Sequence, residues 1–232
     1  MSLSLGLPSK GRLMADAISW FAARGIEISR AGAEREYRAA ARGLQGLEVT
    51  MLSAGEIPRE LAAGRIHIGV TGEDLIQERL PDPAAQVTRL AKMSFGFADL
   101  VVAVPAFWVD VETMGDLDAA AARFRAEHGM ALRVATKYHM LTRAFFRRHG
   151  VADYRLVDSQ GATEAGPANL TAEAITDITT TGSTLAANHL KVLKDGLILR
   201  SEANLWQSNA ASWSPEAHRA LADLVSRLAT AR

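Results

Sequence analysis

The segment richest in groups that could carry chemistry is 177–185, with the sequence DITTTGSTL. A strand pattern ends near Asp177 and a helix pattern begins after the glycine. Backbone N–H groups at a helix start and nearby hydroxyls form a cradle for an anion, and glycine lets the backbone approach a phosphate closely. The spacing predicts a phosphate site, with a hydroxyl-rich helix cap as the alternative. Its candidate residues are Thr180, Thr181, Gly182, Ser183 and Thr184.

Asp177 is an unusual neighbour for a phosphate, because both carry negative charge. The carboxylate makes sense if it binds ribose hydroxyls or a magnesium ion that travels with a pyrophosphate. No lysine follows the glycine as in a Walker loop, and the motifs G-x-G-x-x-G, H-E-x-x-H and G-x-S-x-G are absent. The six histidines show no ligand spacing, so we predict no protein metal site. Hydrolase, metalloprotease and dehydrogenase activities lack their usual support.

Other strand-to-helix junctions also carry polar residues. Lys10, Gly11 and Arg12 lie at the start of the first predicted helix, where the helix dipole disfavours cations unless an anion is bound. Solvated surface cations are the alternative. A second junction holds Thr71, Gly72 and Asp74, for which simple helix capping is about as good an explanation.

Two more loops complete the set of candidates. Lys137 follows a strand and could neutralise a phosphate, and another strand-end loop holds Gly161, Ala162 and Glu164. Such loops converge on one edge of an open α/β sheet, where ligands bind. Arg35 and Arg38 could serve a triphosphate, although surface exposure is the default for such residues.

Composition limits the classes of protein. The chain has 232 residues, 48% of them apolar, enough for one large domain or two small ones. Lys plus Arg and Asp plus Glu number 26 each, which argues against nucleic-acid binding through bulk charge. We find no apolar run of the roughly 18 residues that a membrane span needs, no secretory pattern and no cysteine. We therefore expect a cytoplasmic protein without membrane, disulfide or thiolate sites.

Strand and helix patterns alternate along the chain, which predicts an α/β fold with largely parallel sheets. The strand patterns cover 3–7, 47–52, 66–70, 95–104, 132–135, 154–157, 174–178 and 197–205. The helix patterns cover 11–24, 56–63, 116–128 and 138–149, with a last helix after Ser214. The long stretches near 95–104 and 197–207 either cross between two lobes or are long strands of one sheet. Crossing would give one lobe from 1–103 and 195–232, and a second from 104–194.

Together these segments resemble the ATP phosphoribosyltransferase family. The matching segments are LPSKGRL at 7–13, GVTGEDLI at 69–76, RVATKYHMLTRAFF at 133–146, GATEAGP at 161–167 and ITDITTTGSTLAANHLKVL at 175–193. They occur in family order over most of the chain. The resemblance implies a two-lobed α/β fold of the periplasmic-binding-protein (type II) kind, with the active site in the inter-lobe cleft.

The resemblance also implies the reaction. Family members transfer phosphoribosyl from phosphoribosyl pyrophosphate to N1 of ATP, release pyrophosphate and need Mg²⁺. The reaction opens histidine biosynthesis. This chain looks like the short form, whose partner is a regulatory subunit similar to histidyl-tRNA synthetase, and we expect a homodimer within a hetero-oligomer.

Site roles follow from the same resemblance. The 177–184 loop would hold the 5-phosphate, with Asp177 and Glu173 near the ribose. Lys10, Gly11, Arg12, Thr71, Gly72, Asp74, Lys137, Gly161, Ala162 and Glu164 would face ATP and the cleft. Three positions depart from common family members, because Ser53 and Ala186 stand where arginine is frequent and Glu173 where aspartate is. Without arginine at Ser53, we expect Arg35 or Arg38, with Lys10, to meet the leaving pyrophosphate.

Two rival interpretations remain. A two-lobed solute-binding module would bind ligand without turnover, and its periplasmic forms carry signal peptides, which this chain lacks. A phosphate-dependent regulator should carry a DNA-reading element, and neither the balanced charge nor an evident helix-turn-helix supports one.

Overall fold

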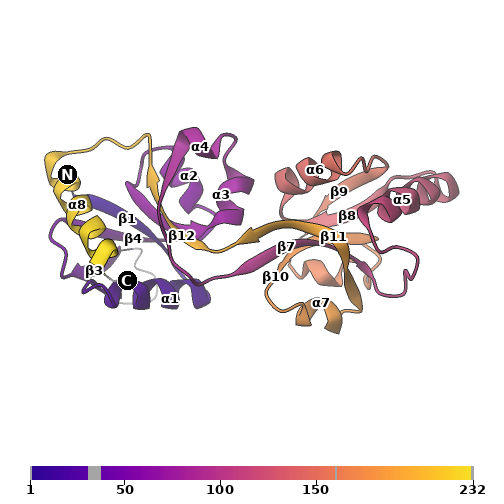
Figure 1. The fold of residues 1–232 in the computed structure, drawn as a ribbon, viewed down its shortest axis with the longest axis horizontal. Coiled ribbons are helices and arrows are strands. Elements are labelled where there is room, and N and C mark those ends of the chain that lie inside the picture. The colour runs from indigo at the N-terminus through magenta and orange to yellow at the C-terminus, as the bar shows by residue number, and fades with distance from the viewer. Residues whose placement is uncertain (1, 31–37, 160, 231–232) are drawn as a thin grey trace. The chain divides into compact units, whose positions relative to one another are not determined.

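The computed structural model describes residues 2–30, 38–159 and 161–230. The chain folds into two compact units, Met1–Phe97 with Glu202–Arg232, and Ala98–Ser201. The second unit is longer at both ends than the expected 104–194. The reason is that β7 (Ala98–Pro105) and β11 (Leu190–Ser201) pair with each other in antiparallel register along nearly their whole length. The chain thus crosses between the units inside both long extended stretches, after Phe97 and after Ser201, which is the first of the two expected alternatives (Figure 1).

The first unit holds a seven-stranded sheet in the order β2-β3-β4-β1-β5-β12-β6 among the described residues. The strands are β1 (Leu3–Pro8), β2 (Glu27–Arg30), β3 (Arg38–Arg42), β4 (Leu47–Leu52), β5 (Ile68–Gly72), β6 (Val87–Lys92) and β12 (Ala203–Ser208). Only the central β1 runs parallel to its neighbours β4 and β5, and the other pairs are antiparallel. The sheet is therefore mixed, not largely parallel as the sequence predicted.

Helices cover this sheet with apolar stripes. They are α1 (Gly11–Ala22), α2 (Ile57–Ala62), α3 (Glu73–Arg79), α4 (Pro83–Gln86) and α8 (Pro215–Thr230). Phe21 of α1 and Leu224 of α8 are fully buried in one core with Leu5 of β1. Proline at its first position favours α8, and the Ser214 hydroxyl accepts a hydrogen bond from the N–H of Ala217. No helix in the described part of the chain is long and apolar enough to span a membrane.

The second unit holds a five-stranded sheet in the order β11-β7-β10-β8-β9 among the described residues. Strand β8 (Leu132–Thr136) runs parallel to both β9 (Tyr154–Asp158) and β10 (Ala174–Thr179). Helices α5 (Met114–His128) and α6 (His139–Arg148) pack on one face, and α7 (Ser183–Ala187) packs on the other (Figure 1). A short 3₁₀ helix spans Thr163–Ala165.

Two turns of the first unit approach each other closely, and each has a glycine at the point of approach. Gly43, between β3 and β4, has φ +90°, and a Cβ there would collide with the carbonyl oxygen of Gly25. Arg227 of α8 donates hydrogen bonds to both carbonyls, at 2.7 Å to Gly43 and 3.3 Å to Gly25. Gly46 in the same connection also has a positive φ, +77°, but a Cβ there makes only ordinary contacts of 3.5 Å or more.

We expect Gly43→Ala to lower the free energy of unfolding well beyond Gly46→Ala. Both variants carry the cost of a left-handed non-glycine residue, about 1–2 kcal/mol. Only Gly43→Ala adds a collision between two backbone segments, which must shift to admit the new methyl group. Urea denaturation of both variants measures the difference, and equal losses would contradict the close approach.

Candidate active site

Three parallel strands of the second unit end at one edge of its sheet. Thr136 at the end of β8 lies opposite both Asp158 of β9 and Thr176 of β10. The segments that leave these strands at this edge are therefore neighbours. They contain the predicted residues Lys137, Gly161, Ala162, Glu164 and Asp177, together with the loop after β10.

Asp177 lies at the centre of this edge and is half-buried. Burial raises the pKa of its carboxyl above the usual value, and the nearby charge of Glu164 acts in the same direction. The N–H of Ile178 (2.8 Å), the charge of Lys137 and the Thr163 hydroxyl favour the charged form but do not outweigh burial. Such a desolvated carboxylate is suited to a ligand that brings hydroxyl donors or a cation.

The loop after β9 is tied to the same place. The Lys137 Nζ donates to the carbonyl oxygen of Gly161 at 2.6 Å. The hydroxyls of Ser159 and Thr163 lie 2.8 Å apart. A pocket of about 330 Å³ opens beside them. It is lined by Ala135, Val157, Asp158, Ser159, Ala162, Thr163, Gly166, Asn169 and Thr171.

The hydroxyl-rich loop after β10 is held by its own hydrogen bonds. Gly182 precedes α7 with φ +74°, and its N–H donates to the Thr179 hydroxyl at 2.9 Å. The hydroxyls of Thr181 and Ser183 lie 2.8 Å apart. A cavity of about 210 Å³ adjoins the loop, lined by Ala98, Ile178, Thr179, Thr180, Thr181, Ser183 and Thr184. A Cβ on Gly182 would meet no atom within 4 Å, so the space beside this backbone is open.

Glu173 does not lie with Asp177. It precedes β10, whereas the loop follows it, and four residues of extended strand span about 13 Å. Its carboxylate accepts hydrogen bonds from the Arg133 backbone N–H at 2.7 Å and from the guanidinium at 2.5 and 3.1 Å. Burial would raise the pKa of Glu173, but the bonds from Arg133 outweigh it and hold the pKa below its usual value. Glu173 thus forms an ion pair with Arg133, and its expected ribose role stays a prediction.

In the first unit, the predicted cations follow β1. Lys10 has an extended backbone before α1, Gly11 has φ +77°, and Lys10, Gly11 and Arg12 are all exposed. The first turn of α1 holds no acidic residue. Because β1 is parallel to β4 and β5, this turn shares an edge of the first sheet with the ends of those strands.

The residues after β5 are largely engaged within the unit. Thr71 is fully buried, and its hydroxyl donates to the Ala54 carbonyl at 3.1 Å. The Thr71 carbonyl accepts the indole N–H of Trp206 at 3.3 Å. Gly72 precedes α3, and Asp74 is buried in its first turn. Thr71 thus ties β5 to its surroundings, and its side chain is not directed at an open site.

Of the two arginines, Arg35 lies outside the described residues. The backbone of Arg38 begins β3 opposite Thr50 of β4, in antiparallel register. This places Arg38 near the end of β4, the edge from which Ser53 follows. The N–H of Ser53 donates to the Glu56 carboxylate at 3.0 Å.

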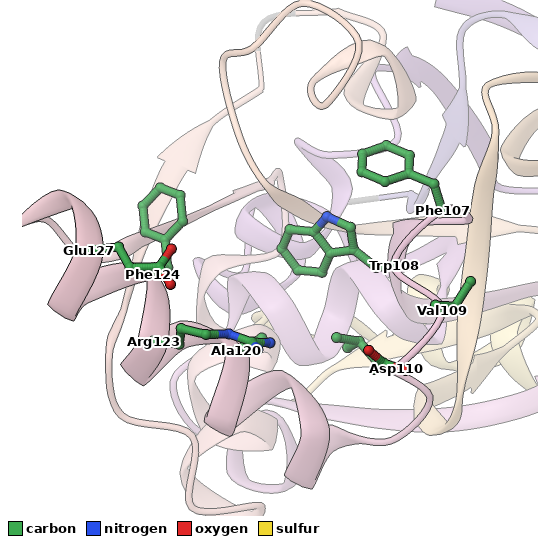
Figure 2. A pocket seen from close by; sticks show the side chains of 9 residues that line it. Phe107, Trp108, Val109, Asp110, Ala120, Arg123, Phe124 and Glu127 are labelled. Carbon is green, nitrogen blue, oxygen red and sulfur yellow. The ribbon is translucent and has the colours of Figure 1, made fainter.

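An aromatic pocket of about 270 Å³ lies elsewhere in the second unit (Figure 2). Phe107, Trp108 and Val109 follow β7, and Arg123 and Phe124 come from α5. None of the residues predicted from the sequence lines this pocket, so it is separate from the candidate site.

Comparisons with known proteins identify the family of this chain. The HisG family model, described as ATP phosphoribosyltransferase, matches residues 53–230. An ATP phosphoribosyltransferase of Cereibacter sphaeroides is 60% identical over 217 residues, covering 94% of this chain and 92% of that protein. The chain belongs to the ATP phosphoribosyltransferase family. A relative of the same name from Bradyrhizobium diazoefficiens is 54% identical, and the match covers 92% of this chain but 66% of that protein.

Solved structures place the fold. The ATP phosphoribosyltransferase (HisG:HisZ) complex from Thermotoga maritima contains a chain with a TM-score of 0.72 at 20% identity, with 99% and 98% of the two chains covered. The periplasmic aliphatic sulphonate binding protein SsuA of Escherichia coli has a TM-score of 0.55 at 16% identity, covering 99% of this chain and 70% of that one. These likenesses confirm the predicted two-lobed α/β fold of the periplasmic-binding-protein kind.

Several residues of the candidate site were not predicted from the sequence. Thr163 bonds to Asp177, and Thr136 and Thr176 precede Lys137 and Asp177 in their strands. Thr163 could have been found, because it lies inside the segment 161–164 that supplied three candidates. The hydrogen-bond partners of Thr136 and Thr176 come from other elements, and no local sequence pattern predicts them.

We expect Glu173→Gln to destabilise the protein by about 2–3 kcal/mol at pH 7, because it leaves the half-buried Arg133 without its charged partner. The folded-state pKa of Glu173 is lowered, so its stabilising contribution is present at neutral pH. That contribution disappears as the pH falls through the folded-state pKa, and the gap between variant and parent should close there. Urea unfolding from pH 7 to pH 3 measures this.

The matched control is Glu112→Gln, which removes the solvent-exposed pair of Glu112 with Lys194 in the same unit. We expect a much smaller loss than for Glu173→Gln, because solvent screens this exposed pair. Equal losses for Glu112 and Glu173 would contradict a structural role of the Arg133 pair.

Asp177→Asn should have the opposite effect on stability. The folded-state pKa of Asp177 is raised, so its charge is unfavourable in the folded state at pH 7. Asparagine keeps the oxygen that accepts the Ile178 N–H, and we expect a gain of about 0.5–1 kcal/mol. The gain should vanish below about pH 4, where the aspartate is protonated in both states. A variant less stable than the parent at pH 7 would overturn this assignment.

Proposed function

We propose that this chain transfers the phosphoribosyl group of phosphoribosyl pyrophosphate to N1 of ATP, the first step of histidine biosynthesis. The observation that carries the proposal is the 177–184 loop. Its hydroxyls and backbone N–H groups stand at the strand-to-helix junction of a chain whose family has this activity.

The chemistry is a displacement at an anomeric carbon. The bond from C1 of the ribose to pyrophosphate breaks, and a bond from C1 to N1 of the adenine forms. Adenine N1 already has a lone pair, so no strong general base is needed. Negative charge grows on pyrophosphate, so catalysis depends on positioning the reactants and neutralising the leaving group.

We assign the 5-phosphate to Thr180–Thr184 and the ribose hydroxyls to Asp177. The ribose hydroxyls would donate hydrogen bonds to the Asp177 carboxylate, whose existing donors do not offset its burial. Lys137, close to Asp177, would offset phosphate charge on the same substrate. The polar walls near Ala162 and Thr163 are available to the second substrate.

Magnesium would arrive with the phosphoribosyl pyrophosphate. No group of three His, Cys, Asp or Glu residues within the described segments could hold a metal ion by itself. Asp177 and Glu164 nevertheless form a pair of carboxylates whose mutual repulsion a divalent cation would relieve. The donor set therefore fits an ion that keeps the substrate phosphates as its other ligands, and its charge would neutralise pyrophosphate.

Cations of the first unit complete the assignment. Lys10 and Arg12 are exposed at the start of α1, whose first turn holds no acidic residue, and the backbone of Arg38 begins near the same edge of the first sheet. With serine at position 53, we assign neutralisation of the pyrophosphate to Arg38 or Arg35 together with Lys10.

For partners, we propose a regulatory subunit resembling histidyl-tRNA synthetase and a homodimer of this chain within that complex. The support is the likeness to a chain of a HisG:HisZ complex. We propose the cytoplasm as the location, because ATP and phosphoribosyl pyrophosphate are supplied there. A non-catalytic solute-binding module is the alternative, favoured only by the fold it shares with SsuA.

The chain, mixed with ATP, phosphoribosyl pyrophosphate and magnesium, should form phosphoribosyl-ATP and pyrophosphate in equal amounts. The reaction is followed by the absorbance of the product, with and without the regulatory subunit. If both substrates bind but no product forms, both with and without the regulatory subunit, the solute-binding alternative is favoured.

A pair of glycine variants tests the phosphate loop. Gly182 and Gly129 both lie in the second unit with φ of +74° and +69°, and a Cβ at either position meets nothing within 4 Å. Alanine at each should therefore cost similar stability. Only Gly182→Ala should raise the KM for phosphoribosyl pyrophosphate, by about tenfold or more, because it obstructs the approach of the phosphate to the backbone. Equal KM values for both variants would contradict the loop assignment.

A further inference from the structure

Three buried threonine hydroxyls meet beneath the candidate site. Thr136 ends β8, Thr176 lies in β10, and Thr142 lies on α6, and all three are fully buried. The hydroxyl oxygens of Thr176 and Thr136 are 2.6 Å apart, and those of Thr142 and Thr176 are 2.7 Å apart. Thr136 and Thr142 close the triangle at 3.5 Å.

The protons of this cluster can be assigned by elimination. Each hydroxyl has one proton to donate. Thr176 donates to Thr136, so the bond between Thr142 and Thr176 must use the proton of Thr142. Thr136 is then left to donate toward Thr142 over the longest of the three distances, and this closes the ring. Thr136 also accepts the backbone N–H of Tyr138 at 2.9 Å.

The ring replaces an apolar surface at one particular place. On the face of the sheet under α6, β8 presents Leu132 and Val134, and β10 presents Ala174, all buried in one apolar core. At the next position toward the loops, both strands change to threonine. Valine has nearly the same shape and would continue that core without polar atoms, so packing alone does not explain three hydroxyls.

Each strand threonine is followed by a charged residue of the candidate site. Thr136 and Thr176 are direct partners in the parallel pair, and Lys137 and Asp177 come next. Side chains alternate between the faces of a strand, so Asp177 leaves toward the face opposite the ring, and Lys137 stands in the turn directly after the end of β8. The bond from Tyr138 N–H to Thr136 also fixes the turn that holds Lys137.

We propose that the Thr136–Thr142–Thr176 hydroxyl ring is a positioning device for the reaction. It fixes the register and orientation with which β8 and β10 present Lys137 and Asp177 to phosphoribosyl pyrophosphate. Hydrogen bonds specify this geometry because they are directional, whereas apolar contacts of the same volume permit small rotations and slips. The proposal rests on the proposed function for its substrate, but the order that the ring imposes on the two strands does not.

The test compares Thr136→Val and Thr176→Val with the corresponding serine variants. Valine keeps the volume and removes the hydroxyl, whereas serine keeps the hydroxyl and removes a buried methyl group. We expect the valine variants to lose about tenfold or more in kcat/KM for phosphoribosyl pyrophosphate, while the KM for ATP changes by less than about twofold. The serine variants should stay within about threefold of the parent, even where they are less stable.

Val134→Ala is the matched control, because it removes buried volume two residues earlier on the same strand. It should lower the melting temperature at least as much as the valine variants, with kinetics close to those of the parent. Parent kinetics in both valine variants, equal kinetic losses in Val134→Ala, or serine variants as impaired as valine would each overturn the proposal.

Hydrogen exchange of the full chain without substrates separates this inference from the proposed function. Amides of 137–138 and 177–184 should exchange about tenfold faster in the valine variants and at parent rates in the serine variants. Unchanged exchange in the valine variants would overturn the ring as a positioning device, whatever the activity. A parent chain without turnover, but with this exchange pattern, would instead refute the proposed reaction.

Discussion

The candidate site depends on the parallel pairing of β8 with β9 and β10. In that register Thr136 lies level with both Asp158 and Thr176. Parallel strands run in the same direction and are joined by long crossovers. The loops that follow them therefore all leave the sheet at the same edge. Segments that are far apart in the sequence therefore meet, and a slip of one residue would send the charged side chains to the wrong face.

Two carboxylates on one short stretch of chain show what this arrangement does. Glu173 receives an arginine fork and a backbone N–H, and its pKa is held below the usual value. The hydrogen-bond donors around Asp177 do not offset the burial of its carboxylate, so its pKa is raised. A protein satisfies its structural charges completely, whereas a partly desolvated group is typical of a position that a ligand completes. The environment, not the residue type, separates the two roles.

The two units share one plan. Each has a group of three parallel strands, and antiparallel strands where the chain passes to the other unit. The first unit is discontinuous in sequence, because β12 and α8 return to it after the whole second unit. In β3 the antiparallel direction brings the backbone of Arg38 close to the end of β4, opposite Thr50.

Periodicity and helix signals in the sequence were enough to predict most helices and the central strands, and the spacing of 177–184 predicted a phosphate loop. The short strands β2, β3 and β6 were not predicted. Strand β3, for example, has the sequence RAAAR and lacks the alternation of apolar and polar residues that marks a half-buried strand. The resemblance placed Glu173 and Asp177 together at the ribose, whereas the structure separates them along β10, since an extended strand separates residues that a helix would bring together. Only the tertiary structure could reveal the threonine ring, because its hydroxyls come from three elements, and Thr136 and Thr176 are 40 residues apart in the sequence. A hydrogen bond depends on atomic positions that the local sequence does not determine.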